Sequence, residues 1–254
     1  MTFLPIHAAG LYGTQFSEPE HKVSDFVISS YIPTLSILAP PRTREANLGS
    51  NIRLLAVPQP PSDGQFPLPG VYAELEHIRA IIQNSPSAQT TLVEPSVGTV
   101  EEVLVQMKEA HWVHFACHGI QDGEHPTDSG LCLADQRRLT LADIISLSCP
   151  RGGLAFLSAC QTATGDIQLS DEAVHIAAGM LFAGYGGVVG TMWSIADRVA
   201  PRVARDVYER LFKLKSEGTP DCREAARALH DAVGRLRKSN ASFVEWIPFI
   251  HAGL

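Results

Sequence analysis

The sequence of 254 residues has few aromatic side chains and no long apolar segment. Phe, Trp and Tyr make up 7% of the chain, so small aliphatic residues and alanine must fill most of its core. A membrane-spanning helix needs about eighteen or more consecutive apolar residues, and no such run occurs. The first residues also lack the basic start and apolar stretch of a signal peptide. We therefore expect a soluble, cytoplasmic protein without a membrane partner.

Cysteine is scarce and irregularly spaced. The five cysteines form no CxxC pair, and an odd count does not suit a disulfide framework, so a reducing compartment is expected. A zinc site built from His114, Cys117, His118 and His125 would match no usual spacing of ligand pairs. The glycine-rich residues 184–190 lack both the spacing and the following lysine of a phosphate-binding loop. The sequence thus predicts neither a metal nor another cofactor.

The balance of charge is acidic. The net charge of −7 argues against nucleic acid as a partner, because binding phosphates needs a basic surface. Residues 198–238 are a local exception, with eleven Lys or Arg and six Asp or Glu. We interpret this excess as the solvated faces of two amphipathic helices.

Apolar segments alternate with helical patterns along the chain. Apolar runs predict strands near 52–57, 111–116, 152–159 and 186–192, with a strand or extended end at 246–254. A further strand is predicted at 89–93, and a short hairpin arm at 130–134. Helices are expected between them, near 71–82, 99–107, 170–183, 203–211 and from Thr219–Pro220 onward. Thr99 and Glu102 predict a capping box for the second helix, and Ser170 a cap for the third. Strands that are apolar throughout predict a mainly parallel sheet covered on both faces. The fold class is therefore α/β, an α/β/α sandwich over 51–254, with residues 1–50 as a loosely ordered lead packed on it.

Reactive side chains follow two of these predicted strands. "HFACHG" ends the strand near 111–116 with His118, and "LAFLSACQTATGD" places Cys160 at the end of the next main strand. Sites in parallel sheets form at the carboxyl ends of the strands, so neighbouring strands would bring the two residues together. An imidazole can take the proton of a thiol and make it a nucleophile. The backbone N–H groups of Gly119 and Cys160 are candidate donors to an oxyanion.

Structural roles for the same residues remain open. A cysteine at a strand end is often a small buried apolar residue, and a histidine there is often a hydrogen-bonded part of the core. Cys117 should point to the face opposite His118 and pack in the core, since side chains alternate along a strand. His175, on an apolar helical pattern, is expected to be a core histidine.

Several ordered motifs resemble a known family. "HFACHG", "SGLCLAD", "LTLADI", "LAFLSACQTATGD", "DEAVHIAAGMLFAGYGGVVGTMWSIAD" and "WIPFI" are similar to motifs of the CHAT domain, a member of the caspase–separase-like cysteine peptidases. The resemblance covers about residues 50–254, and "SYIPTLSIL" extends it to about residue 25. It implies a caspase-like sandwich with His118 as catalytic histidine and Cys160 as nucleophile. Their separation of 42 residues is near the roughly 50 of caspases.

The resemblance also implies a function. The implied function is that of a cysteine endopeptidase that acts in regulated proteolysis or signalling. Its substrate would be a protein or peptide, and a helical-repeat protein would be its regulatory partner. "MWSIAD" is similar to a separase segment in which two acidic residues bind an arginine of the substrate. Ser194 replaces the first of these acidic residues in this chain, and Asp197 matches the second. Cleavage after Arg or Lys would follow, although Asp197 could equally cap the next helix. Gln161 stands where many CHAT sequences have Glu. The alternative function is a catalytically silent scaffold that binds a protein in the same crevice.

The cysteine pattern leads to a prediction about folding. Chelator and reductant together should leave the melting temperature unchanged, because neither a metal nor a disulfide is expected to hold the fold. Differential scanning fluorimetry checks this. A large drop with chelator alone would instead support the zinc site.

Overall fold

A computed structural model describes residues 4–13, 20–38, 51–59, 68–85, 89–120, 122, 124–158, 160–161, 172–213 and 220–254. For Cys160, Gln161 and residues 172–175 it describes the backbone alone, as it does for Ser36 and Leu38. Within these ranges, no helix combines the length and the apolar character needed to cross a membrane.

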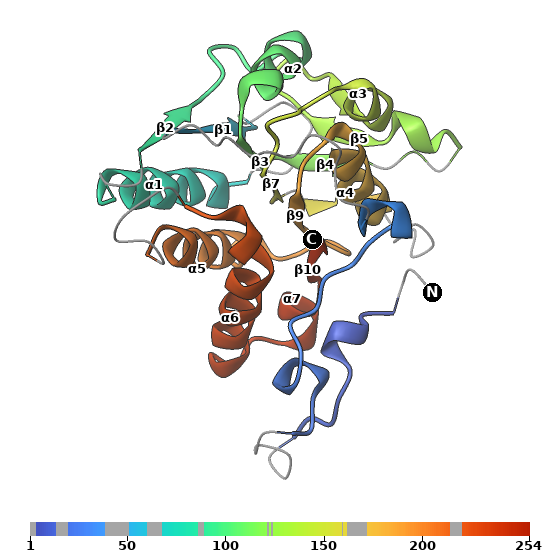
Figure 1. Cartoon of the computed structure of the whole chain (residues 1–254), viewed down its shortest axis with the longest axis vertical. Coiled ribbons are helices and arrows are strands. Elements are labelled where there is room, and N and C mark those ends of the chain that lie inside the picture. Colours follow the sequence, from blue (N-terminus) through green and yellow to red (C-terminus); the bar gives the residue numbers. More distant parts are fainter. Residues whose placement is uncertain are drawn as a thin grey trace.

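A six-stranded sheet forms the centre of the molecule (Figure 1). Its order is β10-β9-β7-β3-β1-β2, and every neighbouring pair is parallel except β9 with β10. The prediction of a mainly parallel sheet is therefore confirmed. The strands are β1 (Ile52–Pro58), β2 (Thr90–Val93), β3 (Trp112–Ala116), β7 (Leu154–Leu157), β9 (Gly187–Thr191) and β10 (Phe249–Gly253).

Helices cover both faces of this sheet, which confirms the α/β/α sandwich. One face packs against α1 (Gly70–Gln83), α5 (Ala200–Lys213) and α6 (Ala225–Lys238). The other packs against α2 (Val100–Glu109), α3 (Leu141–Ser146) and α4 (Glu172–Ala183), seen above and to the right of the sheet in Figure 1. Strands β3, β7 and β9 are buried along their whole length, which explains why their sequences are apolar without alternation.

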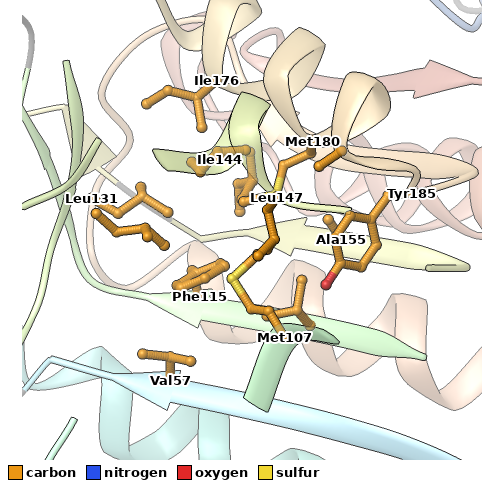
Figure 2. Close-up of a cluster of buried hydrophobic side chains, with 14 of the residues drawn as sticks. Val57, Met107, Phe115, Leu131, Ile144, Leu147, Ala155, Ile176, Met180 and Tyr185 are labelled. Atoms are coloured by element: carbon orange, nitrogen blue, oxygen red, sulfur yellow. The ribbon is translucent and has the colours of Figure 1, made fainter. Parts of the chain in front are cut away.

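The core on the α2–α4 side is built mainly from aliphatic side chains and methionines (Figure 2). Phe115 of β3 lies at its centre and is 0% exposed. Met107 and Met180 reach towards it from two helices, so flexible side chains fill the gaps that a chain poor in aromatics leaves. Cys117 packs in this cluster, as the alternation of side chains predicted.

A second, smaller sheet lies beyond the carboxyl ends of β3 and β7. Its order is β6-β5-β4-β8, formed by β4 (His118–Ile120), β5 (Gly130–Cys132), β6 (Arg138–Thr140) and β8 (Cys160–Gln161). The sequence predicted a hairpin arm at β5, but not the sheet to which it belongs. Both motifs that carry the candidate catalytic residues thus run from the central sheet into this second one.

Some predicted helix starts are right and others are not. Thr99 caps α2 by accepting the N–H of Glu102, at 3.3 Å. The reciprocal half of the expected capping box is wrong, because the Glu102 carboxylate accepts N–H groups of Ser96, Val97 and Gly98 instead. These bonds to the charged form lower the pKa of Glu102 to about 2.

The last long helix begins later than predicted. Thr219 and Pro220 were expected to open it, but α6 starts at Ala225, after a short 3-10 turn at Cys222–Glu224. Thr219 itself, and Ser170, the predicted cap of α4, lie outside the described residues. A short helix, α7 (Phe243–Trp246), leads into β10.

The lead contacts the free edge of the central sheet. Its described parts contain 3-10 turns at Ile6–Ala8, Val23–Asp25 and Leu35–Leu38. Between the last two, the N–H of Tyr31 donates to the carbonyl of His251, at 2.8 Å, and the N–H of Gly253 donates to the carbonyl of Tyr31, at 2.9 Å. The lead therefore forms a one-residue parallel bridge along β10.

The core in Figure 2 leads to a prediction about stability. Phe115→Ala should lower the free energy of unfolding by about 3–5 kcal/mol, because it removes a fully buried ring and leaves a cavity. Phe182→Ala is the matched control: that ring is 55% exposed, so its loss should cost about 0.5 kcal/mol or less. Urea titrations measure both. Equal losses would contradict this assignment of the core.

Candidate active site

The pairing of two short strands brings His118 and Cys160 together. Strands β3 and β7 are parallel neighbours, and β4 and β8 continue beyond them. In the parallel register of β4 with β8, His118 and Cys160 are Cα partners. Paired strands lie about 4.8 Å apart, which places the two backbones side by side. The side chain of Cys160 lies outside the described part of the structure.

His118 is held by a residue that the sequence analysis did not identify. Its backbone N–H donates to Oε1 of Gln59, at 2.6 Å. The N–H of Gln59 in turn donates to the carbonyl of Ala116, at 2.9 Å, so this residue joins the ends of β1 and β3. Both Gln59 and His118 are buried. Gln59 directly follows a buried strand, and this is the same signal that pointed to His118.

The candidate oxyanion donors lie at the same place. Gly119 is paired on both sides, with Leu131 of β5 and with Gln161 of β8. Cys160 opens β8 and pairs with His118. The two backbone amides therefore belong to adjacent positions of one strand pair.

Asp197 bonds to a helix that is distant in the sequence. It lies in the loop between β9 and α5, and its Oδ2 accepts the N–H of Gly70 at the start of α1, at 2.7 Å. A Cβ on Gly70 would lie 2.7 Å from the carboxylate and from the backbone carbonyl of Asp197, so only glycine allows this approach. The helix that donates an N–H to this carboxylate is α1, not α5, which follows Asp197 in the chain.

The four residues of the zinc alternative do not converge. Nε2 of His114 lies 3.3 Å from Glu74, and the side chain of His125 is 70% exposed. Cys117 packs in the apolar cluster on the α2–α4 side. Among the residues that the structure describes, no three His, Cys, Asp or Glu side chains gather as metal ligands. A fold without metal remains a prediction for the chelator experiment.

The remaining cysteines differ in their access to solvent. Cys117, Cys132 and Cys149 are buried thiols, and burial raises the pKa of Cys149. Cys222 is partly exposed. Buried neutral thiols react slowly because the thiolate is the reactive form. Cys222 is therefore the main competitor of Cys160 for a thiol reagent. The side chain of His175, predicted to be core, lies outside the described part.

Several solved structures align with this fold, one of them a cysteine proteinase. The Arg-specific cysteine proteinase gingipain R (RgpB) aligns with a TM-score of 0.51 and 10% identity, over 80% of this chain and 46% of that one. The complex of Porphyromonas gingivalis RgpB pro- and mature domains gives 0.49 and 10%, over 81% and 47%. The Saccharomyces cerevisiae separase–securin complex gives 0.47 and 15%, over 81% and 12%.

These likenesses concern the fold alone. The chain spans about half the length of the gingipain chains and a small part of separase. Among curated proteins, none matches the sequence. The CHAT domain model, in contrast, matches residues 1–254, the whole chain. With a caspase-like α/β fold and a mainly parallel sheet, the chain belongs to the CHAT domain family.

Proposed function

We propose that this chain is a cysteine endopeptidase in which Cys160 is the nucleophile and His118 is the general acid and base. The observation that carries the proposal is the register of β4 with β8, in which the two residues are Cα partners. Thiol and imidazole on adjacent backbones at the carboxyl edge of a parallel sheet are the groups that acyl transfer needs. The fold shared with gingipain R is consistent with this chemistry.

The reaction follows from these two groups. His118 takes the proton of the Cys160 thiol, and the sulfur bonds to the carbonyl carbon of the substrate. The electron pair of the C=O bond moves to oxygen, where the amides of Gly119 and Cys160 donate hydrogen bonds. Collapse of this intermediate breaks the C–N bond, and the leaving amine takes the proton from His118. Water, deprotonated by His118, then cleaves the thioester and releases the thiol.

The environment of His118 fits this role. Its backbone is fixed by Gln59 rather than left on a mobile loop, and the residue is 3% exposed. A site from which water is excluded strengthens each electrostatic interaction within it. A free thiol persists most readily in a reducing compartment, so we propose that the protein acts in the cytoplasm. Protein or peptide substrates and a helical-repeat regulatory partner complete the proposal.

Reactivity of the cysteines is the direct test. Cys160 should alkylate faster than Cys117, Cys132, Cys149 and Cys222 near neutral pH, because the strand register pairs it with the imidazole-bearing His118. His118→Ala should slow Cys160 and leave Cys222 unchanged. A small uncharged electrophile and peptide mass spectrometry give each rate in the folded protein.

The control for this experiment is Cys160→Ala. This variant should lose the fast alkylation reaction and keep the slower reactions of the other four cysteines. Equal reactivity of the five thiols would reject the enzyme. The chain would then be the catalytically silent member of the family, a scaffold that binds a protein partner with the same fold.

Specificity for a basic residue forms a second part of the proposal. We propose that Asp197 receives a Lys or Arg side chain that precedes the scissile bond. One of its oxygens bonds to Gly70, and the residue is only partly buried, in the loop that follows β9. A charge-assisted hydrogen bond of about 1.5–3 kcal/mol would favour a basic over a neutral residue by roughly 10- to 150-fold. Arginine should serve at least as well as lysine.

Asp197→Asn separates recognition from capping. The amide oxygen can still accept the N–H of Gly70, so the free energy of unfolding should change little. Cleavage after Arg in a peptide library should fall, while alkylation of Cys160 stays fast. The matched control is Glu76→Gln, which removes the charge of an exposed carboxylate on α1, the helix that contains Gly70. A cleavage profile unchanged by Asp197→Asn would leave only the contact with α1.

A further inference from the structure

A row of polar side chains lies buried beneath the end of β7. Ser158, the residue after β7, donates its hydroxyl to Oε2 of Glu74, at 2.9 Å. The other carboxylate oxygen lies 3.3 Å from Nε2 of His114, and Nδ1 of His114 lies 3.2 Å from the hydroxyl of Tyr208. These residues come from β3, α1, α5 and the end of β7. All four are buried, with exposures between 0% and 7%.

The Tyr208 hydroxyl in this row stays protonated. Burial and the charge of Glu74 raise the pKa of Tyr208 well above its usual value, so its hydroxyl keeps its proton. This hydroxyl lies within hydrogen-bonding distance of Nδ1 of His114, and which of the two donates depends on the tautomer of the ring. The contact from Nε2 to Glu74 does not have the geometry of a hydrogen bond. The aligned bond of Glu74 is the one from Ser158.

Burying the carboxylate of Glu74 costs free energy of folding. Glu74 is 1% exposed and lies on the side of α1 that faces the sheet, beside Val71, Leu75 and Ile78. Replacing buried ionic groups with apolar side chains is often neutral or stabilising. The row is therefore not needed to hold α1 on the sheet, because apolar neighbours already do so.

The row of polar side chains instead fixes Ser158, which lies shortly before the proposed nucleophile in the chain. The N–H of Ser158 donates to the carbonyl of Phe115, at 2.8 Å, so its backbone is bonded to β3. Its side chain is bonded to α1 through Glu74. Two residues later Cys160 enters β8 and pairs with His118. Ser158 is thus fixed at both its backbone and its side chain where β7 passes into β8.

We propose that Glu74 is a positioning residue for the nucleophile: through Ser158 it sets the place of Cys160 relative to His118. The inference rests on the proposed function, since it concerns the same thiol. Neither Glu74 nor Ser158 takes part in bond making. His114 lies against the other carboxylate oxygen of Glu74, and Tyr208 contacts the imidazole of His114.

The helix that carries Glu74 also contacts Asp197. Gly70, one turn before Glu74, donates its N–H to Asp197. The first two turns of α1 are therefore bonded to the loop after β9 and to Ser158, the residue after β7. This gives α1 contacts with both the proposed specificity residue and the proposed nucleophile segment.

Rates of thiol alkylation test the proposal. Ser158→Ala removes the donor to Glu74, and Glu74→Leu removes the acceptor. Each should slow alkylation of Cys160 by about five- to tenfold across the pH profile, the worth of one hydrogen bond. Ser158→Thr, which keeps a hydroxyl, should restore the rate. The double variant should be no slower than either single one, because both remove the same bond.

Three controls make the outcome decisive. Glu76 lies two residues after Glu74 on α1, and its side chain is exposed. Glu76→Leu should therefore leave the rate of alkylation of Cys160 unchanged. Cys222 in the same sample reports a general loosening of the fold, and the melting temperature reports stability. If Glu74→Leu fails to fold, the comparison of Ser158→Ala with Ser158→Thr decides.

The result also separates this inference from the function on which it rests. If Cys160 of the unmodified protein is not the fastest thiol, the proposed function fails, and this inference with it. If Cys160 is fast and depends on His118, but Ser158→Ala changes only the melting temperature, the peptidase proposal stands. The role of Glu74 would then be structural, and the inference would be wrong.

Discussion

The parallel pairing of β3 with β7 is the constraint on which the candidate site depends. Both strands leave the central sheet at the same edge, and their continuations, β4 and β8, pair again in the second sheet. The pairing of His118 with Cys160 therefore arises from two successive backbone ladders. Since a slip of one residue would change every partner, the apolar burial of β3 and β7 fixes the register beyond them.

Polar residues behind this edge link the central strands to α1. Gln59 joins the end of β1 to the start of β4, and Glu74 joins α1 to the end of β7. Buried polar groups cost free energy unless they are paired, and here the pairings run between elements rather than within them. The two side chains restrict the chain on either side of the proposed dyad, one at His118 and one ahead of Cys160.

The sequence predicted the strands, the layers and the two ends that meet, because continuous apolar runs and polar strand ends are local signals. Gln59 and Glu74 carried such signals as well: one follows a buried strand, and the other lies on the apolar side of α1, between Val71 and Ile78. The bond of Asp197 to Gly70 joins residues 127 positions apart, and no local pattern predicts it. The second sheet likewise depends on pairings between strands of two or three residues, too short for a periodic pattern.

The one-residue bridge of Tyr31 covers part of the edge of the central sheet at β10. An open edge strand exposes unpaired N–H and C=O groups, and another chain can add to them. Tyr31 occupies two of these groups on β10, the carbonyl of His251 and the N–H of Gly253. Its ring also keeps its place, since the hydroxyl lies 2.7 Å from Nδ1 of His7. A strand from a second molecule could extend the sheet at this border only after displacing Tyr31, so the lead protects the fold from edge-to-edge association.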